Sequence, residues 1–275
     1  MNLKELNNLS NNYNNTGKMP VLFVGHGNPM NAIEENEFVQ GFRRIGETIP
    51  KPNAIVVVSA HWETKGVFIT AMKNPRTIHD FSGFPKELYQ VQYLAPGDPE
   101  LAMETKNMIS NKDVGLDYDW CLDHGAWTVL RHIYPNPDIP VIELSLDYTK
   151  APKYHYELAE ELKPLRYKGV LIIGSGNIVH NLRMIDWRRL NDSEYGYDWA
   201  TEFSELVKKN ILIDNHKLLT HYSSIGKDWN LAVPTAEHYL PLLYSLGMKE
   251  KDENIEFFND KIIGGSLGMT SIKIY

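Results

Sequence analysis

The sequence has almost no cysteine: Cys121 is the single one in 275 residues. One cysteine cannot form a disulfide within the chain, which excludes the small disulfide-stabilised secreted class and fits a reducing compartment. No apolar run approaches the ~20 residues that span a bilayer. The asparagine-rich stretch up to Lys18 also lacks the apolar core of a secretory signal. We therefore expect a cytoplasmic protein with no membrane partner.

Basic residues are also few, since Lys and Arg number 28 against 35 Asp and Glu, for a net charge of -7. A duplex-binding protein usually carries a basic stripe, and the chain has no run of Lys and Arg, so we expect no nucleic-acid partner. What the chain does have is apolar material, 43% of its residues, which suffices for a sizeable core. No repeat or Gly-, Ser- or Pro-rich linker divides it. We predict a polar tail or short docking helix over residues 1–19 and one α/β domain over residues 20–275.

Three apolar, β-branched runs each end in a small-residue turn that leads to a histidine. These runs and their histidines are 21–25 with His26, 54–60 with His61, and 170–176 with His180. Continuous apolar runs are typical of strands buried on both faces of a parallel sheet, and residues 140–146 are predicted to join them. Helical patterns lie between the strands, one of them starting at Asp98. The sequence therefore predicts a mostly parallel central sheet flanked by helices.

The three strand-end histidines are expected to meet although they lie far apart in the sequence. In an open parallel sheet, the carboxyl ends of the strands form the edge at which ligands bind. Imidazole is a ligand for iron, zinc, copper and nickel, so this edge is predicted to hold a transition metal. A lone histidine after a strand is more often a hydrogen-bonded structural residue. Three at equivalent strand ends favour a site.

Two further histidines lie where helices are predicted to start. His124 follows Asp123, and a helix N-terminus suits a neutral base or hydrogen-bond partner. Thr235 is the predicted N-cap of a second helix, with Glu237 and His238 in its first turn. Both segments are equally consistent with ordinary polar residues at helix starts. The stretch 73–99, with four prolines and two glycines, is predicted to be a long surface excursion of a kind that is often functional.

Taken in order, the motifs resemble a known family. They are similar to those of the class III extradiol ring-cleavage dioxygenases, and most similar to the branch named for DOPA 4,5-dioxygenase. The resemblance runs from about Pro20 to the C-terminus. The motifs that carry it occupy residues 25–29, 59–62, 79–85, 122–127, 174–181 and 237–241.

The resemblance implies a mononuclear, non-haem Fe(II) enzyme that opens the ring of a catechol, DOPA-like or related, beside its hydroxyls and inserts both atoms of O2. Its partners would be a small aromatic substrate and O2. His26, His61 and His238 would be metal ligands. His180 would be a fourth ligand or an acid/base group, and His124 a substrate-facing catalytic residue.

Several alternatives remain at this stage. The third ligand could be Glu237 in place of His238, as in other branches, although neighbours on a helix point about a quarter-turn apart and are not expected to ligate together. One divalent metal per chain is expected, Fe(II) for activity and Zn(II) as isolated, because zinc stands above iron in affinity. A zinc-bound water would make the protein a hydrolase, with Glu237 or Asp123 as base. A non-catalytic binding relative of the fold is the third alternative.

Four aromatic side chains are candidates for the apolar walls that would hold a substrate ring and exclude water. Packing in the core is the competing interpretation, and it is favoured more for Trp127 than for Phe81. The four are Trp62, Phe81, Phe84 and Trp127.

Overall fold

A six-stranded sheet in the order β6-β2-β8-β1-β12-β9 forms the centre of the molecule. It is seen in a computed structural model that describes residues 17–110, 113–190, 192 and 194–275, so most of the tail predicted for residues 1–19 lies outside the described residues. The strands of the sheet are β1 (Val21–Gly25), β2 (Ala54–Ser59), β6 (Val141–Glu143), β8 (Val170–Gly176), β9 (Ile255–Phe258) and β12 (Ser271–Ile274).

The four strands β6, β2, β8 and β1 are parallel, and β12 and β9 extend the sheet antiparallel. The predicted mostly parallel sheet is therefore confirmed. The strand predicted over 140–146 divides instead into β6 and β7 (Leu146–Asp147), and β7 pairs with β3 (Glu63–Thr64). The chain turns away from β2 there because the backbone N–H of Ser145 bonds to the carbonyl of Phe68, in β4 (Val67–Thr70).

Alternate side chains of the buried strands enter two separate hydrophobic cores. In β1, Val21 and Phe23 face one core, while Leu22 and Val24 face the other. Successive residues of a strand point to opposite faces, so a strand covered on both sides must be apolar throughout. All residues of β2 and β8 are buried in the same way. This explains why these strands are visible in the sequence as uninterrupted apolar runs.

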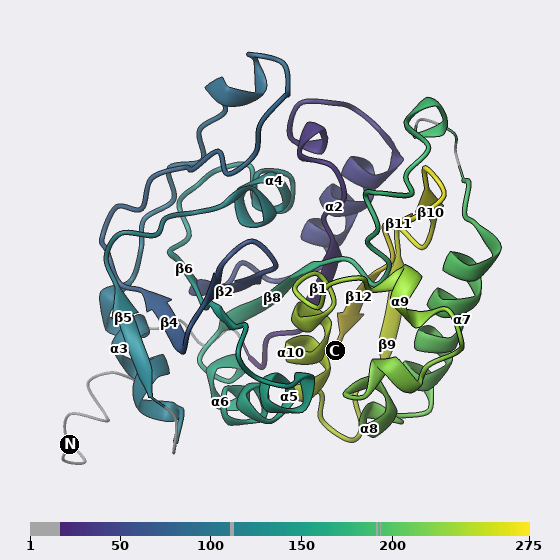
Figure 1. The fold of residues 1–275 in the computed structure, drawn as a ribbon. Helices are drawn as coiled ribbons and strands as arrows, with labels where there is room; N and C mark the ends of the chain where they lie inside the picture. The colour runs from purple at the N-terminus through teal and green to yellow at the C-terminus, as the bar shows by residue number, and fades with distance from the viewer. Residues whose placement is uncertain (1–16, 111–112, 191, 193) are drawn as a thin grey trace.

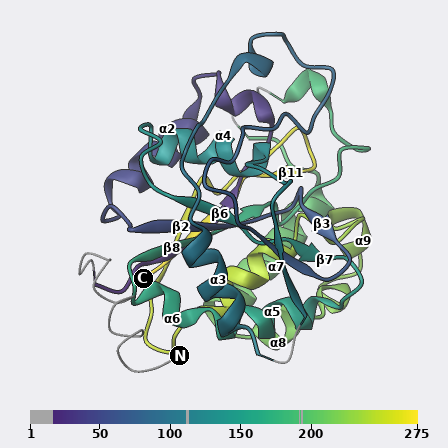
Figure 2. The ribbon, with the colours of Figure 1, turned by 90° about the vertical axis from the view of Figure 1, so that its left-hand side faces the viewer.

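Helices cover both faces of the sheet, as predicted. In Figure 1, α2 and α4 lie above the strands and α5, α6 and α10 lie below, and Figure 2 shows these layers from the side. Among the described residues, no helix has the length and apolar character needed to cross a bilayer. The α-helices are α2 (Glu37–Glu47), α3 (Pro99–Met108), α4 (His124–Ile133), α5 (Pro152–Glu161), α6 (Lys163–Arg166), α7 (Asp198–Leu212), α8 (His216–Leu219), α9 (Trp229–Ala232) and α10 (Leu240–Gly247).

Short elements complete the chain. The remaining strands, β5 (Val114–Asp117), which pairs with β4, and the hairpin of β10 (Ile262–Ile263) and β11 (Leu267–Gly268), lie outside the main sheet. The 3-10 helices are η1 (Pro29–Ala32), η2 (Leu88–Gln90), η3 (Trp187–Arg189) and η4 (Tyr222–Ser224).

The predicted excursion over residues 73–99 folds back onto the protein. It contains only η2 as a helix, and Leu88 and Tyr93 are buried in the core to which α4 contributes. The indole Nε1 of Trp127 in α4 donates to the carbonyl of Ile78 over 2.8 Å. The excursion is thus a packed segment that covers α4, and it is the segment seen above α4 in Figure 1.

The two predicted helix starts have different outcomes. Helix α4 begins where predicted, and Asp123 is its N-cap, since the Asp123 side chain accepts from the backbone N–H of Ala126 over 3.0 Å. The predicted N-cap at Thr235 is wrong, because α10 begins only at Leu240. Proline is tolerated in the first turn of a helix but disrupts its interior. A helix that began after Thr235 would have Pro241 inside it, whereas the observed start places Pro241 in the first turn.

Candidate metal centre

Five histidines from separate parts of the chain line one pocket. His26 follows β1, His61 follows β2, and His124 opens α4. His180 follows β8, and His238 lies in the turn before α10. The pocket has a volume of about 220 Å³. The convergence predicted for the strand-end histidines is therefore present, at the carboxyl ends of the parallel strands.

His61 is at the centre of the cluster. Its Nε2 lies 3.2 Å from Nε2 of His26. Its ring centroid lies 3.8 Å from that of His124 and 5.1 Å from that of His238. Nitrogen atoms of His26, His61 and His124 all lie within 4.8 Å of one another, a spacing at which they could share one metal ion.

His180 and His238 form a second group beside the first. Their rings stack with centroids 3.4 Å apart and an interplanar angle of 8°. Glu237 completes this group, in which the possible ligand atoms again lie within 4.8 Å. The ring of His238 lies 5.3 Å from that of His26, so the two groups face one pocket.

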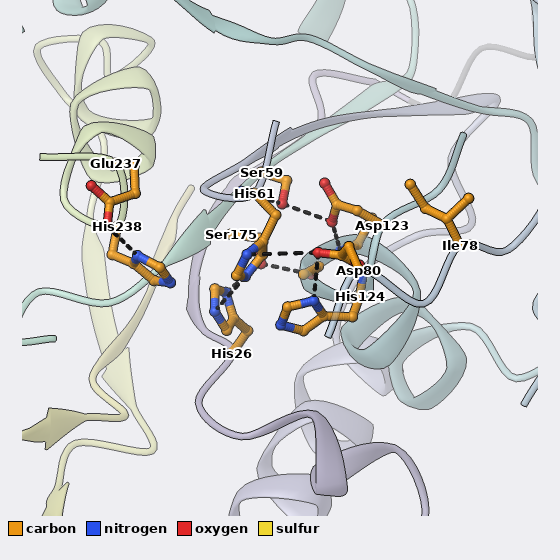
Figure 3. A network of polar contacts seen from close by, with 12 residues as sticks. His26, Ser59, His61, Ile78, Asp80, Asp123, His124, Ser175, Glu237 and His238 are labelled. Atoms are coloured by element: carbon orange, nitrogen blue, oxygen red, sulfur yellow. Dashed lines mark hydrogen bonds and ion pairs between the residues drawn. The ribbon is translucent and has the colours of Figure 1, made fainter. Parts of the chain in front are cut away.

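Hydrogen bonds fix the orientation of His26. The hydroxyl of Ser175 donates its only proton to the carbonyl of Gly125 over 2.6 Å. It must therefore accept from Nδ1–H of His26, which lies 3.0 Å away. This leaves the lone pair of His26 on Nε2, the atom that faces His61 (Figure 3).

His238 is held in a similar way by its neighbour. Its Nδ1 lies 3.2 Å from Oε1 of Glu237, which also accepts from the hydroxyl of Thr235 over 2.7 Å. Histidines that bind metals usually donate their second N–H to such a partner, which sets the tautomer. Glu237 is thus occupied as a hydrogen-bond acceptor for His238, and both lie in a turn and not on a helix as expected.

Burial keeps most of the cluster uncharged. It lowers the pKa of His26 and His238 well below the ordinary value, with further lowering from the neighbouring histidines. Burial first and His124 second lower the pKa of His61 to about 3. Burial also lowers the pKa of His180 to about 4. Neutral imidazoles are the form that binds metals, so this donor set fits a divalent transition metal.

Asp80, from the excursion, lies against two of these histidines. Its carboxylate oxygens accept from the backbone N–H of His124 over 2.9 Å and from Nδ1 of the same residue over 2.8 Å. Nδ1 of His61 lies 3.8 Å from the carboxylate. Burial alone would raise the pKa of Asp80, but the hydrogen bonds from His124, with a further contribution from the nearby His61, outweigh burial and lower the pKa. No role for Asp80 could be assigned from the sequence, since the partner lies 44 positions away.

A second carboxyl group, that of Glu143, accepts a hydrogen bond from the backbone at the start of α4. The backbone N–H of Asp123 donates to Glu143 over 3.0 Å, and both side chains are fully buried. Burial, together with the neighbouring Asp123, raises the pKa of Glu143 well above its ordinary value. Burial also raises the pKa of Asp123, to about 6. Ser59, two residues before His61, donates to Asp123 over 2.8 Å, which ties the pair to the end of β2.

The two glycines beside His26 are required for different reasons. Gly27 has φ +67°, a conformation that other residues rarely adopt. A Cβ atom on Gly25 would lie 2.5 Å from the backbone oxygen of Met269. The close approach of these two segments is what places His26 at the pocket.

The walls of the pocket are apolar, but only half of the predicted aromatic residues form them. Phe81 and Phe84 line the pocket as expected. Trp62 does not line it and stacks on Trp120 with ring centroids 5.6 Å apart, and Trp127 is fully buried in the core. The remaining apolar lining was not predicted and comprises Pro29, Leu182, Ile185, Trp187 and Leu267.

Comparison with known families identifies this arrangement. Residues 19–269 match the family model described as the catalytic LigB subunit of aromatic ring-opening dioxygenase. The chain belongs to this family. The match spans both histidine groups and every strand of the six-stranded sheet except β12, and it confirms the resemblance and the class of enzyme inferred from the motifs.

Individual LigB relatives cover nearly the whole chain. The 4,5-DOPA dioxygenase extradiol of Escherichia coli is 45% identical over 94% of this chain and 95% of its own length. The Beta vulgaris protein of the same name is 35% identical over 91% of this chain and 94% of its own. The crystal structure of an uncharacterised Escherichia coli protein superposes with a TM-score of 0.81 at 40% identity, covering 94% of this chain and all of that one.

Proposed function

We propose that this LigB-family protein is an Fe(II)-dependent extradiol dioxygenase that opens the ring of a catechol-type aromatic with O2. The observation that carries the proposal is the convergence of five imidazoles on one small, apolar-walled pocket. The two relatives named above, both 4,5-DOPA dioxygenases, support a DOPA-like or related catechol as substrate. The volume of about 220 Å³ is below the ~300–1,000 Å³ of typical ligand pockets and suits a single ring.

The proposed metal ligands are His26, His61 and His238. The first two present nitrogens 3.2 Å apart, and His238 has its Nδ1 occupied by Glu237, which favours His238 over Glu237 as the third ligand. His180 is better suited to acid/base work. Ring lone pairs lie in the ring plane, so two parallel rings 3.4 Å apart direct them side by side and not to one point.

Iron(II) bound at this site would hold a catechol and O2 next to each other and supply the redox chemistry that a side chain cannot. The residues of the chain then bind, orient and move protons. His124 takes the proton of a catechol hydroxyl on Nε2, and a neutral imidazole suits that role. Phe81 and Phe84 flank the ring and exclude water from it.

The test of this function is a comparison of metals. The protein is stripped with a chelator under anaerobic conditions and reloaded with Fe(II) or Zn(II), and oxygen uptake is followed with a panel of catechols. The iron form should consume O2 and produce a yellow ring-opened semialdehyde. The zinc form should do neither, because zinc has no accessible redox change.

Two results would contradict the proposal. Oxygen uptake by the zinc form at the rate of the iron form would exclude the proposed role of iron. Inactivity of both forms with every catechol, together with cleavage of an ester or amide by the zinc form, would establish the hydrolase in its place.

Replacing His124 separates its role from that of the ligands. His124→Ala should retain the metal but lower kcat by about 10²- to 10⁴-fold, the usual contribution of a general acid or base. Metal content by elemental analysis and kcat for catechol give the two readouts. His221→Ala, which removes an exposed histidine, is the control. Loss of metal from His124→Ala would show that this residue is a ligand.

A further inference from the structure

The excursion contributes one charged side chain to the pocket, Asp80. Each of its carboxylate oxygens has a separate donor in His124: Oδ1 accepts from the backbone N–H and Oδ2 from ring Nδ1. Figure 3 shows Asp80 between His124 and His61, with its carboxylate turned toward both rings. The side chain of Asp80 is 17% exposed and that of His124 is 9% exposed, so water competes little for these bonds.

The donors and acceptors in this pair leave a single arrangement of protons. A carboxylate accepts hydrogen bonds and donates none at neutral pH. Nδ1 of His124, 2.8 Å from Oδ2, must therefore carry the ring proton. In a neutral imidazole the other nitrogen, Nε2, then holds the lone pair.

From this geometry we propose that Asp80 is a positioning residue, which holds His124 in the tautomer whose Nε2 can accept a proton from the substrate. The proposal rests on the acid/base role of His124 in the proposed function. Asp80 does not contact the substrate in this role. It acts through its two hydrogen bonds with His124.

The excursion does not depend on Asp80 for its own attachment. The backbone N–H of Ile78 donates to the carbonyl of Leu122 over 2.9 Å, and Leu122 donates to Arg76 over 3.0 Å. Trp127 adds the bond to the carbonyl of Ile78. Three hydrogen bonds thus hold the strand-like segment just before Asp80. Removing the carboxylate should leave this segment and the aromatic wall in place.

Phe81 fixes the ring of His124 from another side. Its ring meets that of His124 edge-on, with centroids 5.4 Å apart and an interplanar angle of 85°. This contact limits the position of the imidazole but exchanges no proton with it. Asp80 therefore supplies what Phe81 cannot, the choice between the two neutral tautomers.

Asp80→Asn is the sharpest substitution, because it preserves the shape of the side chain and replaces one acceptor oxygen with an amide N–H donor. The backbone N–H of His124 is always a donor, so the amide oxygen of the substituted side chain would take that place. The amide N–H group would then face Nδ1 of His124, which favours the tautomer with its proton on Nε2. An analogous exchange in a serine-protease triad leaves the geometry intact and lowers kcat by about 10⁴-fold.

The expected result for Asp80→Asn is a fall in kcat of about 10²-fold or more, with metal content and the KM for catechol unchanged. Asp117→Asn is the matched control, since Asp117 also accepts from backbone N–H groups but has no histidine partner among the described residues. In the zinc-loaded protein, ¹⁵N NMR of labelled histidine should show the His124 proton on Nδ1 in the wild type and on Nε2 in Asp80→Asn. This readout does not depend on turnover.

A double-mutant cycle separates positioning from structural support. Asp80→Asn should cost almost nothing further in a His124→Ala background, because the group it orients is absent. A full additional loss in that background, or loss of metal from Asp80→Asn alone, would overturn the proposal. The proposal would also be overturned if the wild type is active and the kcat of Asp80→Asn lies within two-fold of the wild-type kcat. If the wild type is inactive with every catechol, the proposed function is overturned instead.

Discussion

His61→Ala should yield a folded protein that no longer holds stoichiometric metal and has no measurable oxygen uptake with catechol. His61 is central, with ring centroids 3.8 to 5.1 Å from those of His124, His26 and His238. Removing the imidazole takes one nitrogen ligand from a metal and leaves the other histidines around an empty space. Because neutral imidazoles bind through directed lone pairs, the remaining ligands cannot close that space without moving their strands.

The measurement is metal content after Fe(II) or Zn(II) loading and desalting, followed by oxygen uptake. Circular dichroism should show the wild-type fold, since His61 follows β2 and is outside the two cores. His221→Ala should retain full metal and activity. Full metal occupancy in His61→Ala would show that the ligand set proposed here is wrong.

Glu253→Ala should destabilise the fold by about 3 to 5 kcal/mol, the usual cost of leaving one member of a buried ion pair alone. Its partner Arg166 is fully buried. The guanidinium contacts both carboxylate oxygens of Glu253 and also donates to the carbonyls of Met19 and Met248 over 2.9 and 2.8 Å. Without Glu253 the guanidinium keeps its charge but loses the only carboxylate bonded to it among the described residues.

The effect should depend on pH in a defined direction. Burial would raise the pKa of Glu253, but hydrogen bonds from Arg166 and Lys18 overcome it and lower the pKa to about 2 from 4.5. A depressed carboxyl pKa stabilises the fold fully above the unfolded value, and this stabilisation is lost as the pH falls from about 4.5 to about 2. The difference between wild type and Glu253→Ala should shrink over that interval.

Urea unfolding at several pH values measures this prediction. Glu250→Ala is the control, because Glu250 pairs with Lys18 near the surface and such a pair contributes at most about 1 kcal/mol. Equal losses in the two variants would contradict a special role for the buried pair. A difference that stays constant down to about pH 2 would contradict the assigned pKa.

The sequence was sufficient for the features that depend on burial and on local turns. β1 and β8 were predicted with their observed bounds because strands buried on both faces are apolar at every position. His26 and His61 could be placed because they directly follow such strands. Asp123 could be placed because an N-cap acts within three residues of itself.

The features that failed depend on contacts between distant parts of the chain. Thr235 has the pattern of an N-cap, but Pro241 delays the helix. Trp62 was predicted to line the pocket, but it stacks on Trp120, a contact that the sequence does not show. The partners that orient the site are 44 positions apart for Asp80 and His124, and 149 for His26 and Ser175. No local sequence pattern predicts contacts between residues so far apart in the chain.

The wide spacing of the proposed ligands along the chain has a consequence for assembly. His26, His61 and His238 belong to three segments that meet only in the finished fold, so the unfolded chain offers a metal no ready chelate. Metal would then bind after folding and favour the native state by mass action, by about 2.7 kcal/mol at a hundredfold excess over its dissociation constant. The folded protein would bind iron or zinc according to which ion is available to it. The concentrations of free metal in the cell, and not the nascent chain, would therefore determine what fraction of the enzyme is active.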